Sequence, residues 1–308
     1  MSDSHDSTMT AGNNGNNAGD NSDTAGTAGV DDTVEADSRG DRVRTDLGIL
    51  AGVSDRGLVH ARNEDAMALG NRGNRAAAVV CDGVSTVRDP QLAARAAADA
   101  ASRVLLADPP RHATSASARA LAQAGNRLVR AAVTEAAEAV ARLGESDEPD
   151  PPACTLACAL VGDSVLTIGW VGDSRAYWLA EPGSEEPSRL LSTDHSWATA
   201  MIESGRMDAA TAWADRRAHA ITRWLGRGGE PEPEVLTWRP DGSGVLLVCS
   251  DGLWNYLSEP DELADVVLPA LAEGASPLEV AGELTDLALD AGGRDNITVV
   301  VCPVPLGS

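Results

Sequence analysis

The chain has 308 residues, 43% of them apolar, and a formal net charge of −23. This length and apolar content are typical of a globular protein with a sizeable core. With 24 Lys and Arg against 47 Asp and Glu, the charge argues against nucleic acid as a partner, because phosphate backbones are bound by concentrated basic residues.

The sequence offers no membrane segment or export signal. No run approaches about 18 consecutive apolar residues, and the first residues lack the basic and then apolar pattern of a signal peptide. We therefore expect a cytoplasmic protein that does not bind a membrane.

The N-terminal region differs in composition from the rest of the chain. It consists of Gly, Asn, Ala, Ser, Thr and Asp with almost no large apolar side chain, so it cannot bury enough area to offset the entropy of ordering. We expect a disordered acidic tail over residues 1–45 and one folded domain over residues 46–308.

Strand-like and helical patterns follow in groups. Short apolar runs bounded by turn residues predict strands, and Ala- and Leu-rich stretches with a period near 3.6 predict helices. The predicted strands are 47–54, 76–81, 154–161, 165–171, 175–179, 245–249 and 297–302. The predicted helices are 90–106, 115–143, 260–267 and 277–291.

The segments between these elements are turns and irregular structure. Residues 145–152 are acidic and Pro-rich and predict a loop, the three runs between 154 and 179 predict a β-meander, and residues 196–220 predict irregular structure with short helices beside the site. Strand groups interrupted by pairs of helices favour an α+β fold with stacked antiparallel sheets over a doubly wound parallel sheet.

The cysteines do not suggest a disulfide framework or a zinc site. Their number, five, is odd, and each lies in an apolar run. We expect reduced thiols in the core.

Four Asp-bearing segments stand where an apolar run breaks into a turn, around Asp82, Asp173, Asp251 and Asp295. A carboxylate at the end of a buried strand is costly unless a cation meets it. Hard divalent cations such as Mg²⁺ and Mn²⁺ prefer carboxylate, carbonyl and water oxygens. The pattern therefore indicates a cluster of divalent cations shared by these carboxylates.

Six motifs in order resemble those of the metal-dependent protein phosphatases, the PPM or type 2C serine/threonine phosphatases, of the bacterial type. The resemblance covers about residues 47–303. The motifs are Arg62-Asn63-Glu64-Asp65, Cys81-Asp82-Gly83, Gly172-Asp173-Ser174-Arg175, Asp194-His195-Ser196, Ser250-Asp251-Gly252-Leu253-Trp254 and Gly293-Arg294-Asp295-Asn296-Ile297-Thr298.

This resemblance implies a sandwich of two antiparallel sheets flanked by helices on both sides, a four-layer αββα fold, with two Mn²⁺ or Mg²⁺ ions at one end. By motif position, Asp82 would bridge both ions, the Gly83 carbonyl would bind one, and Asp251 and Asp295 would hold the other.

The resemblance gives the remaining acidic residues secondary roles. Glu64 and Asp65 would act directly or through water, and Asp173 would join Asp251 at a third ion that some bacterial members carry. Two cations about 4 Å apart lower the pKa of a bridging water and clamp the phosphoryl oxygens, so no Cys or Ser nucleophile is required.

Three departures from the family pattern bear on the site. His60 stands where many bacterial members have a phosphate-binding Arg, so we assign phosphate binding to His60 and Arg62, with Arg56 as another cation in reach. Val84 removes a His that is a candidate leaving-group acid in animal members, and Asn255 replaces an Asp that some members use at the third site.

The Asp194-His195-Ser196 run is not a hydrolase triad in our interpretation. Adjacent residues cannot all converge on one oxygen, and triad partners come from separate strands. We interpret the run as a structural turn.

The function predicted is metal-dependent hydrolysis of phosphoserine and phosphothreonine in proteins, by a monomer whose partners are phosphorylated proteins, a Ser/Thr kinase or its substrates. The alternatives are a phosphatase-like sensing or scaffold module with partner-dependent activity, and a metallohydrolase that acts on small phosphate esters. The first is favoured because Asp82, Asp251 and Asp295 are all present.

Overall fold

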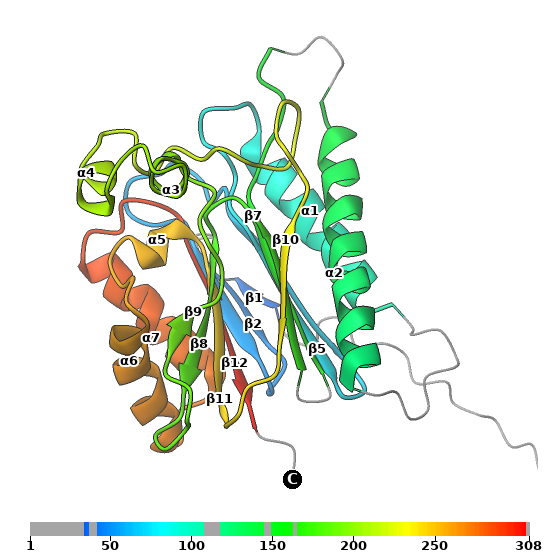
Figure 1. Ribbon diagram of the computed structural model, residues 1–308, viewed down its shortest axis with the longest axis vertical. Coiled ribbons are helices and arrows are strands. Elements are labelled where there is room, and N and C mark those ends of the chain that lie inside the picture. Colours follow the sequence, from blue (N-terminus) through cyan, green and yellow to red (C-terminus); the bar gives the residue numbers. More distant parts are fainter. Residues whose placement is uncertain (1–33, 37–41, 108–117, 145–148, 163–164, 306–308) are drawn as a thin grey trace, which may run out of the picture.

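The computed structural model describes residues 34–36, 42–107, 118–144, 149–162 and 165–305. Two antiparallel sheets lie face to face, with one pair of long helices outside each sheet, so the molecule has four layers in the order helix, sheet, sheet, helix (Figure 1). The α+β sandwich with helices on both sides is therefore confirmed.

One sheet has five strands in the order β10-β7-β6-β5-β4. Along the chain these strands are β4 (Ala66–Arg72), β5 (Arg75–Cys81), β6 (Leu156–Gly162), β7 (Val165–Val171) and β10 (Glu234–Trp238).

The other sheet has seven strands in the order β1-β2-β3-β12-β11-β8-β9. They are β1 (Val34–Ala36), β2 (Arg42–Asp46), β3 (Ala51–Asp55), β8 (Arg175–Ala180), β9 (Arg189–Leu190), β11 (Gly244–Cys249) and β12 (Ile297–Val304).

Helices α1 (Pro90–Leu105) and α2 (Ala118–Ala141) cover the five-stranded sheet, and α6 (Pro260–Ala272) and α7 (Pro277–Asp290) cover the seven-stranded one (Figure 1). Three short helices, α3 (Trp197–Glu203), α4 (Ala209–Trp213) and α5 (Asp251–Trp254), lie at one end of the sandwich, opposite the end that carries the C-terminus.

The central strands are buried on both faces, which explains their continuous apolar runs. In β11, Leu246 and Val248 point between the sheets, while Val245, Leu247 and Cys249 pack under α6 and α7. The two facings alternate because successive side chains of a strand point to opposite sides. Strands held by packing on both faces give fixed positions to the residues at their ends.

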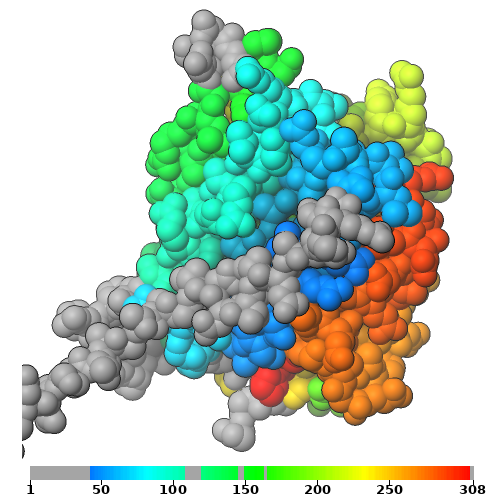
Figure 2. All heavy atoms as spheres, turned by 180° about the vertical axis from the view of Figure 1, so that it is seen from behind, coloured from blue at the N-terminus to red at the C-terminus, as the bar shows by residue number. Residues whose placement is uncertain are grey.

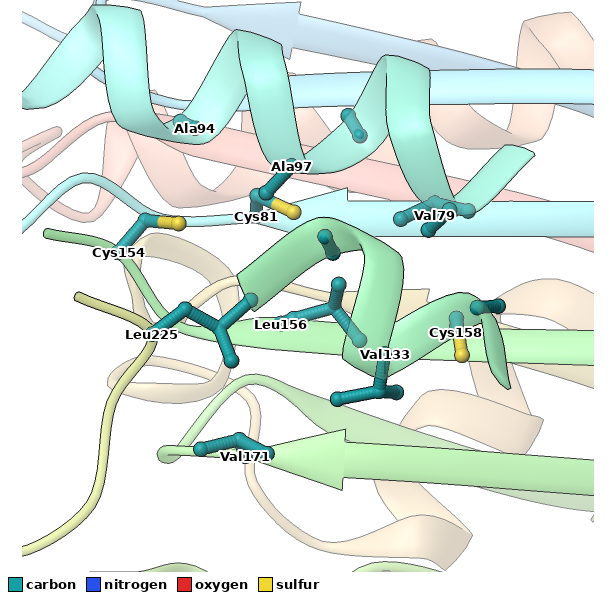
Figure 3. Close-up of a cluster of buried hydrophobic side chains, with 14 of the residues drawn as sticks. Val79, Cys81, Ala94, Ala97, Val133, Cys154, Leu156, Cys158, Val171 and Leu225 are labelled. Carbon is teal, nitrogen blue, oxygen red and sulfur yellow. The ribbon is translucent and has the colours of Figure 1, made fainter. Parts of the chain in front are cut away.

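Small side chains let α1 lie close to its sheet. Ala93, Ala94, Ala97, Ala98 and Ala101 are fully buried on one side of this helix. In Figure 3, Ala94 and Ala97 of α1 and Val133 of α2 face Val79, Cys81, Leu156 and Cys158 of the sheet. All five cysteines are free and buried, as expected.

The strand directions bring the predicted acidic motifs to one end of the sandwich. Asp82 follows β5 and Asp251 follows β11, whereas Asp65 precedes β4 and Asp295 precedes β12. The register pairs Cys81 with Ala66 and Cys249 with Val299, so in each sheet the motif-bearing ends coincide. This is the end where α3, α4 and α5 lie.

The strands near the N-terminus differ from those predicted. Strands β1 and β2 precede residue 46 and belong to the seven-stranded sheet, and the division of the chain into a tail and a folded domain stays a prediction. The predicted strand 47–54 is instead a turn followed by β3: Gly48 has φ +73, and its N–H donates to Asp46 Oδ1 at 2.8 Å. Residues 1–33 and 37–41 lie outside the described residues.

The predicted β-meander is also wrong. Strands β6 and β7 pair with each other, but β8 pairs with β11 in the opposite sheet. The chain crosses between the sheets at Gly172, whose φ is +107. The crossing places Asp173 between the two sheets at the end that carries the other acidic motifs.

Strands β1, β2, β4, β9 and β10 were not predicted at all, whereas the four long helices were. Residues 145–148 of the predicted loop lie outside the described residues. Within the described ranges, no helix is both long and apolar enough to cross a membrane.

Candidate metal centre

Carboxylates from both sheets meet at this end of the sandwich. Asp65 and Asp173 are only 8% and 5% exposed. The charge of Asp82 interacts with those of Asp65, Asp251, Asp173 and Asp295. The structure therefore brings together the five predicted Asp residues from strand ends far apart in the sequence.

Burial and mutual repulsion disfavour the ionised forms of these groups. Burial raises the pKa of Asp82 well above its ordinary value, and the neighbouring carboxylates raise it further. Burial likewise raises the pKa of Asp251 to about 7, with a contribution from Asp295, and raises that of Asp173. Among the described residues, the carboxylates of the cluster outnumber the side-chain cations that act on them, which are His60 near Asp251 and Arg175 near Asp173.

Asp65 is oriented by two hydroxyl groups. Its Oδ2 accepts hydrogen bonds from Ser250 Oγ and Thr298 Oγ1, both at 2.7 Å. Burial raises the pKa of Asp65 to about 7, while these two hydroxyls act in the opposite direction. Ser54 Oγ lies 2.8 Å from Thr298 Oγ1 and extends the hydroxyl chain.

Two oxygens of the centre lack hydrogen-bond partners. Within the described residues, Asp65 Oδ1 and Glu64 Oε2 are buried without a protein partner. An unsatisfied buried acceptor is costly. Both oxygens therefore fit a cation or a cation-bound water as their missing partner.

The backbones of Gly83 and Glu64 lie close together. A Cβ at Gly83 would lie 2.6 Å from the Glu64 carbonyl oxygen, so only glycine fits there. The amide of Asp82 donates to Thr155 Oγ1 at 3.1 Å, and Thr155 N donates to the Asp82 carbonyl at 2.8 Å. These contacts fix the Asp82-Gly83 backbone against the start of β6.

Asn296 ties the loop between β3 and β4 to the start of β12. Its Oδ1 accepts from Glu64 N at 2.7 Å, and its Nδ2 donates to the carbonyls of Arg56 at 2.7 Å and Arg62 at 3.1 Å. Figure 2 shows the chain around residues 50–65 in blue beside the red C-terminal part. Asn296 is 3% exposed, so this clamp is part of the buried structure.

The predicted phosphate-binding residues lie at the rim of the centre. His60 Nε2 is 3.3 Å from Asp295 Oδ1. Arg62 is more exposed, and its Nη1 is 4.0 Å from Asp89 Oδ1. Arg56 donates to the His60 carbonyl through Nη1. His60 thus lies directly at the cluster, whereas Arg62 is directed to a neighbouring carboxylate.

The Asp194-His195-Ser196 run is not a turn as predicted but irregular chain that leads into α3, where Ser196 is extended. Asp194 forms a two-bond ion pair with Arg175 at 2.9 and 2.7 Å. His195 Nδ1 accepts from Gly172 N at 3.0 Å, and Ser196 caps α3. The three side chains have three different partners, so they do not form a triad.

Sequence reasoning missed the groups that support the carboxylates. Ser250, Asn296 and Thr298 were inside quoted motifs but had no assigned role, and Ser54 and Thr155 were not singled out. Asn255 Nδ2 donates to Asp251 Oδ2 at 3.2 Å, so this residue supports Asp251. The available signal was polarity: buried polar side chains beside an acidic motif need partners.

The donor set fits hydrated divalent cations. Among the described residues, no three His, Cys, Asp or Glu side chains are arranged to hold an ion by themselves. Mg²⁺ usually keeps several waters and takes one or two carboxylates from a protein. The carboxylates at this centre therefore match an ion whose shell is completed by water.

Comparison with known proteins agrees with this geometry. The sequence model of the family described as Protein phosphatase 2C matches residues 52–297. The serine/threonine protein phosphatase PstP of Mycobacterium tuberculosis is 31% identical over 261 residues, which are 82% of this chain and 44% of that protein. The chain therefore spans less than half the length of that relative.

Two further comparisons cover nearly the whole length of the matched chain. The serine/threonine phosphatase stp of Listeria welshimeri is 30% identical over 80% of this chain and 92% of its own. The solved catalytic domain of PstP, in complex with two manganese ions, is 27% identical with a TM-score of 0.59, over 86% of this chain and 99% of that one.

The clustered carboxylates predict how the stability of the metal-free protein changes with pH. The pKa values of Asp65, Asp82 and Asp251 lie above their unfolded values, so the folded state holds more protons between about pH 4 and 7. The stabilisation from these groups is present below this window and is lost as the pH rises through it.

We therefore expect Asp82→Asn to raise the melting temperature of metal-free protein at pH 8 by several degrees, and to change it less at pH 5. Mn²⁺ at pH 8 should stabilise the wild type more than the variant. Calorimetric unfolding of both proteins, with and without EDTA, measures this. Equal pH profiles for the two proteins would show that burial and the neighbouring carboxylates do not raise the pKa of Asp82.

Proposed function

The chain belongs to the protein phosphatase 2C family, and we propose that it hydrolyses phosphoserine and phosphothreonine in proteins with the help of bound Mn²⁺ or Mg²⁺. The observation that carries the proposal is the meeting of Asp65, Asp82, Asp173, Asp251 and Asp295 at one end of the sandwich, where they repel one another. A pair of divalent ions is the partner that such a group of carboxylates requires.

We assign the ions to the carboxylates by the position of each residue in the motifs that resemble those of the family. Asp82 would bridge two ions, with the Gly83 carbonyl on one and Asp251 and Asp295 on the other, and Glu64 and Asp65 would act directly or through water. Asp173 and Asp251 would serve a third ion. When bound, the ions activate a water for attack and neutralise charge on the phosphoryl oxygens.

The chain's own groups hold the acceptors in place. Ser250 and Thr298 each donate to Asp65, and Asn296 holds the backbone that carries Glu64. Groups fixed before the reaction need no reorganisation in the transition state. All five thiols are buried, which supports water rather than a cysteine as the nucleophile.

His60 and Arg62 are our candidates for binding the phosphate of the substrate. His60 already lies 3.3 Å from Asp295, so its ring can reach an anion held at the same centre. Arg62 Nη1 lies 4.0 Å from Asp89 Oδ1 at an exposed site. An exposed pair of this kind is weak, so a phosphate can compete for the guanidinium.

A module whose turnover depends on a partner is the second candidate. It is motivated by the same two cations, because each faces a carboxylate of this chain. Such a module would bind metal but turn over slowly until a partner rearranged His60 and Arg62.

The partners that we propose are phosphorylated proteins, among them a Ser/Thr kinase or its substrates. The relatives are named as serine/threonine phosphatases, which supports this class of substrate. A cytoplasmic location and a monomeric state stay predictions.

The proposed activity is tested by Mn²⁺-dependent hydrolysis of a phosphothreonine peptide and of p-nitrophenyl phosphate, with a nucleotide as the competing small ester. We expect Asp82→Asn and Asp251→Asn each to lower kcat/KM by about 100-fold or more, since each removes a charge that the ions require. Asp99→Asn is the matched control, because Asp99 lies on α1 in an exposed i,i+4 pair with Arg95.

Turnover of the peptide above that of the nucleotide supports a protein phosphatase. Metal binding in calorimetry without turnover of any substrate would favour the partner-dependent module instead. Unchanged kcat/KM in both Asp variants, with unaltered folding, would refute the metal mechanism.

The role of His60 is tested by exchanging its side chain. His60→Arg supplies a permanent charge and should bind inorganic phosphate at least as tightly as the wild type, whereas His60→Gln should raise the inhibition constant of phosphate about tenfold. His219→Gln provides a matched control, because His219 contacts Trp213 and Trp254 rather than Asp295. Equal phosphate inhibition in the wild type and His60→Gln would remove His60 from the phosphate site.

A further inference from the structure

The two most exposed large apolar side chains among the described residues are neighbours in the sequence. Leu58 is 65% exposed and Val59 is 68% exposed. Single apolar residues scattered over a surface are ordinary, but these two follow each other directly and immediately precede His60, whose Nε2 is 3.3 Å from Asp295 Oδ1. Leu58 and Val59, called here the apolar rim, therefore border the candidate phosphate-binding group.

The loop that carries the apolar rim is held against the residues around Asp295. Leu58 N donates to Gly293 O at 2.7 Å, and Gly57 N donates to Asp55 Oδ1 at 2.8 Å. Gly57 has φ +74, and a Cβ there would collide with the Asp295 carbonyl oxygen, so only glycine allows the two backbones to approach in this way. The apolar rim thus has a fixed position beside Asp295.

Leu58 extends the apolar surface of α7 towards the metal centre. A Cβ at Gly293 would lie 2.9 Å from Leu58 Cγ and 3.0 Å from Leu289 Cδ2, so both leucine side chains lie over this glycine. Leu289 is one of the partly buried side chains packed on the core under α6 and α7. Leu58 is therefore supported by protein on one side and open to solvent on the other. A ligand can cover such a side chain without first ordering the loop that carries it.

Basic side chains flank the apolar rim, although the chain as a whole has a formal charge of −23. Arg56, His60 and Arg62 lie on the same loop, where Arg56 donates to the His60 carbonyl and Arg62 Nη1 is 4.0 Å from Asp89 Oδ1. A ligand that matches this surface combines an anionic group with an apolar group next to it. A phosphorylated residue followed or preceded by an aliphatic residue has this combination.

We propose that the apolar rim is a specificity subsite, which binds an aliphatic side chain directly next to the phosphorylated residue of a protein substrate. The proposal rests on the proposed function, since it takes the phosphoryl group to be bound at the metal centre. Consecutive Cα atoms of a peptide are about 3.8 Å apart, so a neighbouring side chain reaches Leu58 and Val59 when the phosphoryl group lies at His60. Leu, Ile or Val is favoured there over Ala, because covering the larger side chain removes more apolar surface from water.

A peptide side chain fits the apolar rim better than a second copy of the chain does. Stable contacts between proteins bury about 1,200–2,000 Å² in total, and two side chains supply only a small part of such an area. Two copies would also bring together formal charges of −23 each, which repel one another. One aliphatic side chain that is anchored by the phosphoryl group beside it needs only the local surface.

The test compares two phosphothreonine peptides that differ only in the residues on either side of the phosphothreonine, which are Leu in one peptide and Ala in the other. With Mn²⁺, we expect the wild type to hydrolyse the Leu peptide with a kcat/KM about tenfold higher than that of the Ala peptide. Leu58→Ser and Val59→Ser should each reduce this ratio, and the double variant should abolish it. Leu58→Met should keep the ratio, because it keeps a large apolar side chain. The ratio is measured within one protein sample, so a partial loss of folded protein does not change it.

Ile49→Ser is the matched control. Ile49 is also an exposed aliphatic residue, at 52%, but it precedes β3, which begins opposite Val301 and reaches the start of β12 only at Asp55. Ile49 therefore lies at the end of the sandwich remote from Asp295. We expect this variant to keep the wild-type ratio between the two peptides.

A second measurement separates the subsite from the activity. Calorimetry with the same two peptides, in which a phosphonate replaces the phosphate ester and cannot be hydrolysed, should show that the wild type binds the Leu peptide about tenfold more tightly. The double variant should bind both peptides equally. A protein that shows this preference in binding but hydrolyses neither phosphate ester would support the subsite and refute the proposed activity.

Three outcomes would overturn the subsite. Equal hydrolysis of the Leu and Ala peptides by the wild type would do so while leaving the proposed activity intact, as would a preference for Leu that persists in the double variant. A wild-type dimer in sedimentation that the double variant converts to a monomer would instead assign the apolar rim to a second copy of the chain.

Discussion

Repulsion between buried carboxylates is the constraint on which the rest of this structure depends. Burial already disfavours the ionised forms of Asp82, Asp173 and Asp251, and each also meets the charge of at least one other acidic residue of the cluster. Folding alone does not reward such an arrangement, since burying like charges together costs stability. Buried groups that lower the stability of the fold in this way are characteristic of functional sites.

The fold tolerates this cost because its strands are held on both faces. Strands β5 and β11 are packed between the sheets on one face and under a helix pair on the other. Their ends cannot relax apart without disturbing that packing. The Ser250 and Thr298 hydroxyls and the Asn296 amide then fix the loops that join the strands. The carboxylates therefore stay close together. Since folding has already removed their hydration, a divalent cation can bind them without a further loss of carboxylate solvation.

Much of the framework could be predicted from the sequence. The long helices have a clear 3.6-residue period, and the buried strands β5, β7, β11 and β12 are continuous apolar runs between turn residues. The acidic motifs were recognisable because each Asp stands at the end of such a run. Their spatial meeting was predicted from the resemblance to a known family and from the need for a shared counter-charge, and the structure brings them together.

There are physical reasons why the remaining strands and contacts could not be predicted from the sequence. Strand β10 lies at a sheet edge with mixed burial, and its sequence does not alternate clearly. Strand β2 follows a polar segment and is held by the Arg42 ion pairs with Asp55 and Asp286 rather than by an apolar pattern. The crossing of β8 to the other sheet depends on long-range pairing with β11, which local sequence does not reveal. Likewise, no local signal shows that Thr298 would meet Asp65, 233 residues away in sequence.

The most direct test of the account is an anomalous-scattering map from crystals of the full chain soaked in Mn²⁺. We predict two strong peaks between Asp82, Asp251 and Asp295, with the Gly83 carbonyl beside one of them. Peaks elsewhere, or none at this end of the sandwich in a folded protein saturated with Mn²⁺, would contradict the claim that these carboxylates are gathered to hold metal ions.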